Sequence, residues 1–415
     1  MNVDVDFLDA AAWDERMPER TRWLRAHDPV FWSAKSRVWV ITKYADLAAI
    51  SKNQELFTSA EGVRAGRNVK IGLIDEGEPR HTQLRNLINK GFTPRLVRRL
   101  EAPFQKATTD VIDAVARRGT CDFVEEIAVP LPLIMIAEMI GVRPEDRQRF
   151  HEWSDAMIAA DGNYDDPQIM AASAKAFTEY SAYVDEIIEA RRRAPQDDLI
   201  SILTGADDRG LLRRFEQEEI PSGTAPAALN LANNELLLLL VILMVAGNET
   251  TRNGMSGGMQ LLIEHPAERA KLIADPALVP SAIEEMLRLV SPVLSFSRTV
   301  TADTELRGKT LRRGEQVLLL YGSANRDEEV FEDAEAFRAE RNPHHLAFGI
   351  GTHFCLGANL ARMEMRTLFE HLLRRLPDIE YAAGGPVMRP SALVRSCVEM
   401  RVRYTPERQP ARASA

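Results

Sequence analysis

A cysteine near the C-terminal end of the chain lies in a segment that could make it reactive. Cys355 belongs to residues 345–357, where Gly349 and Gly351 permit a tight turn, and a predicted helix begins just after it. A sulfur at the start of a helix meets unpaired N–H groups and the positive end of the helix dipole, which favour the thiolate. A thiolate there could bind a metal or attack an electrophile, whereas a free cysteine is usually a buried structural residue. All three interpretations stay open from the residue types alone.

A second group of polar residues interrupts an apolar segment. Residues 236–247 are apolar, and Glu249 and Thr250 follow within three positions of their end. A carboxylate beside a hydroxyl can relay protons into a site that bulk water does not reach freely. The alternative is a solvated ion pair between Glu249 and Arg252, three residues further along an exposed turn. The apolar run before these residues favours the buried relay.

Charged residues recur at helical spacing in two other places. Glu285 and Arg288 are three residues apart on a predicted helix, on the face opposite its apolar residues. Taken alone, this spacing indicates a surface ion pair. His81 and Arg85 are four residues apart and share one helical face, and Arg298 lies in the run Ser295-Phe-Ser-Arg298-Thr. Each of these cations alone is typical of an ordinary protein surface.

The elements that must position these residues are mostly helices. Apolar residues recur at helical spacing over residues 361–376, until Pro377 ends the pattern. The apolar run from residue 236 continues in helical composition to about residue 262, which predicts a core helix about 45 Å long. Short alternating or apolar stretches predict strands at 38–42, 317–320 and 398–404. The expected fold class is mainly α with small β-sheets.

The composition is that of an ordinary globular protein. The 415 residues are 45% hydrophobic and 27% charged, which is enough chain to bury a large core and enclose a ligand. The net charge of −9 argues against a nucleic-acid partner and suits a soluble protein, which we expect to be a monomer.

The cysteine count and the apolar segments predict the compartment. Three cysteines (Cys121, Cys355 and Cys397) are too few for a disulfide framework and indicate a reducing environment. The N-terminal segment has no signal-peptide pattern, and the 12-residue apolar run at 236–247 is too short to cross a bilayer, for which about 20 residues are needed. We therefore expect a cytoplasmic protein without a stable membrane anchor.

Three motifs together resemble one known family. The run Phe348-Gly349-x-Gly351-x-His353-x-Cys355-x-Gly357 resembles the haem-binding loop of the cytochrome P450 family, position for position. Residues 246–251, Ala-Gly-Asn-Glu-Thr-Thr, are similar to the oxygen-activation motif of that family. Glu285 and Arg288, with Arg341 downstream, resemble its structural triad. The resemblance runs from about Trp39 to Met400, nearly the whole chain.

The resemblance implies a role for each candidate site residue. Cys355 is expected to bind the iron of haem b, with Phe348 beside the sulfur and Gly349 in the same cofactor-binding loop. Glu249 and Thr250 are expected to relay protons, while Gly247 leaves room for dioxygen and water against the backbone. The expected partners of the two haem propionates are His81, Arg85, Arg298 and His353.

The resemblance also implies a fold and an activity. We expect the cytochrome P450 fold as one domain over residues 1–415 that encloses the haem, with about 1–35 and 406–415 peripheral. The expected reaction inserts one oxygen atom of O2 into a C–H bond of an apolar small molecule, with a leaning toward sterols, branched lipids or terpenoids. Pocket candidates by position are residues 63–71, Met244, Val245, Leu294, Phe296 and Val394.

The electrons for this reaction are expected to come from a separate ferredoxin and ferredoxin reductase. A basic cluster of Lys90, Arg95, Arg98 and Arg99 could bind such an acidic partner, or could be a solvated helix face. Two other functions stay open as alternatives. One is a haem-thiolate sensor or carrier without turnover, and the other is a peroxide-driven peroxygenase, against which the pair Glu249 and Thr250 argues.

Overall fold

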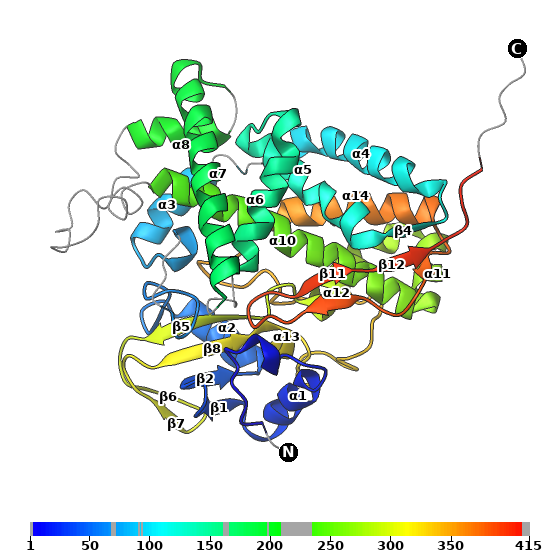
Figure 1. The fold of residues 1–415 in the computed structure, drawn as a ribbon. Coiled ribbons are helices and arrows are strands. Elements are labelled where there is room, and N and C mark those ends of the chain that lie inside the picture. Colours follow the sequence, from blue (N-terminus) through cyan, green and yellow to red (C-terminus); the bar gives the residue numbers. More distant parts are fainter. Residues whose placement is uncertain are drawn as a thin grey trace, which may run out of the picture.

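The computed structural model describes residues 3–67, 72–89, 92, 94–160, 166–196, 199–208 and 235–408. The described part is mainly helical, as expected from the sequence (Figure 1). The helices are α1 (Met17–His27), α2 (Tyr44–Lys52), α3 (Arg80–Asn89), α4 (Pro94–Ala116), α5 (Pro130–Ile140), α6 (Arg147–Ala159), α7 (Pro167–Arg193), α8 (Leu199–Asp208), α10 (Glu235–Glu264), α11 (Pro266–Ala274), α12 (Val279–Val290), α13 (Tyr321–Ala324) and α14 (Ala358–Arg375).

The strands are short and form small sheets. They are β1 (Val30–Ser33), β2 (Val38–Ile41), β3 (Phe57–Thr58), β4 (Thr120–Asp122), β5 (Ser295–Val300), β6 (Thr304–Leu306), β7 (Lys309–Leu311), β8 (Gln316–Leu320), β9 (Glu380–Tyr381), β10 (Val387–Arg389), β11 (Ser396–Glu399) and β12 (Arg401–Arg403). The five-stranded sheet has the order β1-β2-β8-β5-β3, in which β2 and β8 are parallel and β5 and β8 antiparallel. It lies on one side of the molecule, and helices α4 to α8 gather on the other side (Figure 1).

Helix α10 runs through the middle of the helical part and spans 30 residues, as the sequence predicted. Its glycines allow two neighbouring helices to approach closely. A Cβ atom on Gly257 would lie 2.6 Å from Val290 of α12, and one on Gly258 would lie 2.8 Å from Phe369 of α14. The segment Leu236–Glu264 is long and apolar enough to cross a membrane by length and composition, but 61% of its most apolar window is buried inside the fold. This burial is what a core helix of a globular protein requires.

The N-terminal segment, which we expected to be peripheral, contributes to the core. Phe7 and Leu24 are fully buried, and they belong to one hydrophobic cluster with Val40 of β2 and Leu318 of β8. The buried Arg25 of α1 also forms an ion pair with Glu328, with Nη2 and Oε1 2.9 Å apart. Residues 3–27 therefore pack against the five-stranded sheet, and β1 is one of its strands.

The prediction of a single strand at residues 398–404 is wrong, because the chain forms the two strands β11 and β12 there. β11 pairs with β10, whereas β12 pairs with β4 and β9 in another sheet. Met400 lies between them and is 1% exposed. Alternation of side chains continues across Met400, so the pattern in the sequence does not reveal the change of partner.

Candidate haem site

The loop before α14 places Cys355 with a set of backbone hydrogen bonds. The N–H of Cys355 donates to the carbonyl of Phe348 at 2.8 Å, which closes the loop. Gly349 and Gly351 have φ of +69° and +81°, a region that favours glycine. A side chain at Gly351 is also excluded because its Cβ would lie 2.6 Å from the carbonyl oxygen of Ser51 in α2. The motif positions of this loop thus have local structural reasons.

The pKa of the Cys355 thiol shifts in the direction opposite to the one expected for a cysteine at the start of a helix. Burial raises the pKa of its thiol above the ordinary value, although the backbone N–H of Gly357 and the charges of Arg85 and Arg362 act in the opposite direction. Proximity to the helix start is therefore outweighed by desolvation. A bound metal cation is the additional positive charge that would hold such a thiol as thiolate.

Four basic side chains, which we predicted as partners of the haem propionates, lie near this loop. His81 and Arg85 come from α3, Arg298 from β5 and His353 from the cysteine loop. The rings of His81 and His353 have centroids 4.0 Å apart. Burial and the charges of Arg298, His81 and Arg85 together lower the pKa of His353 to about 2. The structure therefore brings together groups that repel one another when protonated.

These residues fit the carboxylates of a haem. Arg298 is 3% exposed, and its Nε atom is buried without a hydrogen-bond partner among the described residues. A buried guanidinium N–H without an acceptor is costly, so an anionic ligand is the group that this cluster lacks. Within the described ranges, no group of three or more His, Cys, Asp and Glu side chains could hold a metal ion. A single cysteine ligand suits an iron whose other ligands come from a porphyrin.

One contact of this cluster was not foreseen from the sequence. The hydroxyl of Ser59 lies 2.9 Å from Nε2 of His353 and donates to the carbonyl of Glu76 at 2.9 Å. Since the hydroxyl hydrogen is used, Ser59 accepts a hydrogen from His353 and sets the tautomer of its ring. A lone serine in a loop carries no sequence signal for such a role.

The middle of α10 has an uncovered side. Ala246 is exposed and Thr250, one turn later, is half-buried, although Met244 and Glu249 on either side are buried. The Thr250 hydroxyl donates to the carbonyl of Ala246 at 2.7 Å. This back-bonding is the one expected of a threonine inside a helix. This exposed turn is where a ligand could lie against α10.

Gly247 has a different role from the one we predicted. A Cβ atom at this position would lie 2.4 Å from Cδ1 of Ile136 in α5. Gly247 thus lies on the face of α10 that packs against α5, about 100° around the helix from Ala246. Its small size lets the two helices approach, and the space beside it is filled by Ile136 rather than left for dioxygen and water.

Glu249 is buried, as predicted, but it is also ion-paired with Arg252. Their side chains are 3% and 6% exposed, so the pair is not the solvated one of the alternative interpretation. Asn253 donates to the Glu249 carboxylate at 2.8 Å, and Arg252 also pairs with Asp155 of α6 at 3.3 Å. The described hydrogen bonds do not join Glu249 to the Thr250 hydroxyl, which donates to Ala246.

The triad lies in the core rather than on a helix surface. Arg288 makes two hydrogen bonds to the Glu285 carboxylate, at 2.7 and 2.8 Å, and both side chains are fully buried. Arg341 approaches the same carboxylate, with Nε and Oε1 2.9 Å apart. Arg288 also donates to the carbonyl of Asn325, whose side-chain oxygen accepts the N–H of Leu346 at the start of the cysteine loop. The triad thereby supports the segment that carries Cys355.

The pocket candidates are only partly consistent with the structure. Leu294, Phe296 and Val394 are half-buried, whereas Met244 is fully buried in the core. Met244 is therefore closed off from a substrate in this structure. Residues 68–71 of the predicted segment 63–71 lie outside the described residues.

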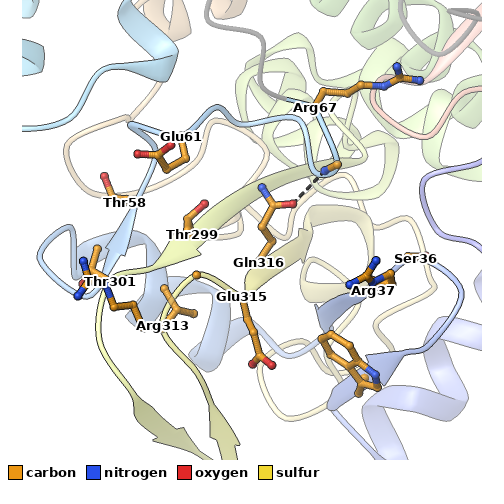
Figure 2. Close-up of a pocket in the computed structure, with 14 residues that line it drawn as sticks. Ser36, Arg37, Thr58, Glu61, Arg67, Thr299, Thr301, Arg313, Glu315 and Gln316 are labelled. Atoms are coloured by element: carbon orange, nitrogen blue, oxygen red, sulfur yellow. Dashed lines mark hydrogen bonds between the residues drawn. The ribbon is translucent and has the colours of Figure 1, made fainter.

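A separate cavity of about 970 Å³ lies on the five-stranded sheet (Figure 2). Its walls include Trp32, Arg67, Thr299 and Arg313, and Gln316 accepts a hydrogen bond from the N–H of Gly66 at 2.9 Å beside it. No residue that we assign to the haem site lines this cavity. It is therefore distinct from the surroundings of Cys355.

The loop cysteine, the four converging basic groups and the uncovered turn of α10 define a haem-thiolate protein. Residues 147–377 match the sequence profile of the family Cytochrome P450. Steroid C26-monooxygenase of Mycolicibacterium smegmatis is 38% identical over 406 residues, covering 97% of this chain and 96% of that protein. Steroid C26-monooxygenase of Mycobacterium tuberculosis is 38% identical over 407 residues, covering 97% and 98%.

Solved structures agree with this match. CYP109E1 of Bacillus megaterium, crystallised with testosterone, superposes with a TM-score of 0.79 at 32% identity over 93% of this chain and 98% of that one. CalO2 superposes with a TM-score of 0.84 at 28% identity over 97% and 99%. The chain belongs to the cytochrome P450 family. It has the P450 fold, is a monooxygenase and uses haem b, as the motifs predicted.

Proposed function

We propose that this monooxygenase hydroxylates a sterol or a related steroid. The observation that supports this substrate class most strongly is the 38% identity, over nearly the whole chain, to two steroid C26-monooxygenases. The half-buried apolar residues Leu294, Phe296 and Val394 are compatible with an apolar ligand. The position of oxidation follows from how the substrate is held, so the proposal concerns the class of substrate.

In this proposal Cys355 is the protein ligand of the haem iron, and Phe348 and Gly349 shape the loop around it. Haem, when bound, supplies the binding and activation of dioxygen. Arg298, whose Nε has no hydrogen-bond partner in the described part, binds a propionate together with His81, Arg85 and His353.

Thr250 and Glu249 are proposed to handle the protons. The Thr250 hydroxyl lies on the uncovered side of α10 and gives up its bond to Ala246 when it donates toward the reacting oxygen. Glu249 re-protonates this hydroxyl after its carboxylate has left Arg252 and taken up a proton from water. Arg252, which also pairs with Asp155, holds the carboxylate near the site until then.

We further propose how the protein operates in the cell. Residues 1–415 act as one domain of a soluble, monomeric, cytoplasmic protein, and electrons come from a separate ferredoxin and ferredoxin reductase. Arg98 and Arg99 are exposed on α4, where an acidic partner could bind. Of the other members of the predicted basic cluster, Lys90 and the side chain of Arg95 lie outside the described residues.

The test begins with the absorbance of the purified, dithionite-reduced protein with and without carbon monoxide. We expect a Soret band shifted far to the red, and we expect Cys355→Ser to lose it. A variant that keeps this band would refute the ligand assignment.

The substrate class is then tested by spectral titration and turnover with a sterol, a fatty acid and a terpenoid. We expect the sterol alone to give NADH-dependent product with ferredoxin and its reductase. Product from the fatty acid alone would overturn the substrate class. Product with hydrogen peroxide in place of the electron donors would identify a peroxygenase, and no product under either condition would favour a sensor or carrier.

A further inference from the structure

An ion pair that the sequence did not single out connects two helices behind the cysteine loop. Arg362 of α14 donates from Nε and Nη2 to the two carboxylate oxygens of Glu284 in α12, both at 2.7 Å. The planar fork of arginine makes such a two-bond contact rigid. Burial opposes ionisation of Glu284, but hydrogen bonds from Arg362 and His345 outweigh it and lower the pKa of the carboxyl group to about 2. The carboxylate is therefore charged at neutral pH.

His345 fixes the same carboxylate from a third direction. Its Nε2 lies 3.2 Å from Oε2 of Glu284, and its Nδ1 accepts the N–H of Ala347 at 3.1 Å. Because Nδ1 accepts, the hydrogen of a neutral ring is on Nε2 and points to Glu284. The side chain of His345 is 2% exposed. Glu284 is thus connected to α14 and to the first residues of the cysteine loop.

The guanidinium of Arg362 lies over an aromatic ring of that loop. Its Cζ atom is 4.5 Å from the centroid of the Phe348 ring, within the range of a cation–π contact. The carbonyl of Phe348 accepts the N–H of Cys355. Arg362 therefore lies over the ring of the residue whose carbonyl holds the N–H of Cys355, which places a positive charge beside the segment that carries the sulfur.

We propose that Glu284 is a positioning residue that holds Arg362 over Phe348, so that a guanidinium charge stays near the Cys355 sulfur and limits its electron donation to the haem iron. This inference rests on the assignment of Cys355 as iron ligand. Only a flat, two-bond contact keeps the guanidinium parallel to Glu284 and over the ring, so the exact side chain matters more than its charge. Glu284 and Arg362 touch neither substrate nor cofactor in this role.

Release of Arg362 should lower the reduction potential of the haem iron, whereas loss of the Glu284 charge alone should raise it. Without Glu284 the guanidinium turns to solvent, the thiolate donates more electron density, and the ferric state is favoured. We expect Glu284→Gln and Arg362→Lys each to lower the equilibrium constant for one-electron reduction about threefold, a fall of about 28 mV at 59 mV per tenfold. Loss of a negative charge with no movement of Arg362 would instead raise the potential for Glu284→Gln and leave it unchanged for Arg362→Lys.

The experiment is a spectroelectrochemical titration of the substrate-free holoenzyme, with the carbon monoxide spectrum of each variant recorded alongside. The reduction potential of the double variant should be no lower than that of either single variant, because both changes release the same contact. The matched control is the pair Arg366 and Glu101, one helical turn further along α14, with Nη2 and Oε1 3.0 Å apart and both side chains part-exposed. Arg366→Lys and Glu101→Gln should leave the potential unchanged.

Each outcome decides the proposal. A higher reduction potential for Glu284→Gln or an unchanged one for Arg362→Lys would overturn the proposal. An equal fall of the potential in the control variants would overturn it too. If Glu284→Gln fails to take up haem, Arg362→Lys decides alone, because it keeps the Glu284 carboxylate and the net charge of the protein. If the wild-type protein lacks the red-shifted carbon monoxide band, the assignment of Cys355 as iron ligand is wrong. If the band is present but the potentials do not change as expected, only the positioning role of Glu284 is wrong.

Discussion

The buried triad leads to a quantitative prediction for the variant Glu285→Gln. Glu285 and Arg288 are fully buried, and Arg341 shares the same carboxylate. A neutral amide at this position leaves two guanidinium groups facing a site without a negative charge. Removing one partner of a buried ion pair costs about 3 to 5 kcal/mol, because the other charge stays desolvated.

This cost translates into a measurable shift of the unfolding midpoint. An unfolding entropy of about 2.1 cal/mol/K per residue corresponds to about 0.9 kcal/mol per degree for 415 residues. We therefore expect Glu285→Gln to lower the midpoint by about 3 to 6 °C. Because Arg288 also supports the start of the cysteine loop through Asn325, the variant should release haem at the same temperature at which it unfolds.

The measurement is thermal unfolding followed by far-UV circular dichroism and by Soret absorbance. The control is Glu380→Gln, because Glu380 and Arg403 also form an ion pair at 2.8 Å but both are more than half exposed. An exposed pair contributes about 1 kcal/mol or less, so the control should move the midpoint by about 1 °C or less. A shift for Glu285→Gln no larger than that of the control would refute the reasoning that burial makes this pair important.

Three further predictions concern the site and its supports. Thr250→Ala should keep haem and substrate binding but divert NADH-derived electrons to hydrogen peroxide, while Thr250→Ser keeps the coupling; the ratio of product to NADH consumed checks this, and an unchanged ratio would exclude a role in proton delivery. Gly247→Ala should destabilise the fold by about 1 to 3 kcal/mol in urea titration, because its Cβ would lie 2.4 Å from Ile136. The additional change Ile136→Ala should relieve part of that strain, whereas lost activity at unchanged stability would favour a role of Gly247 in binding oxygen. Glu284 has a depressed pKa of about 2, so its stabilisation is complete above the ordinary value of 4.5 and is lost as pH falls toward 2; the difference in unfolding free energy between wild type and Glu284→Gln should shrink between pH 6 and pH 3, and a constant difference would contradict a charged carboxylate.

The mainly helical fold class could be predicted from the sequence because helical periodicity is a local pattern. The periodicity that ends at Pro377 and the apolar run of α10 depend only on neighbouring residues, and both helices lie where the pattern placed them. The strands were less predictable. Residues 398–404 alternate as one strand, but their two halves hydrogen-bond to different sheets, and the choice of partner depends on segments far away in the chain.

The sequence by itself determined which residue types occur at which spacing. The glycines, His353 and Cys355 of the loop identify the haem-binding motif without any structure, and the same is true of Glu249 and Thr250 in the long helix. These motifs are local because a tight turn and a helical face each need only a few consecutive residues.

Only the tertiary structure decided what surrounds those residues. It filled the space beside Gly247 with Ile136, gave Glu249 a buried cation, and placed Arg298 next to a histidine 55 positions later. It also raised the pKa of the Cys355 thiol through burial, against the effect of the helix start. Burial, desolvation and ion pairing depend on which distant elements cover a given face, and a local pattern specifies the face but not its cover.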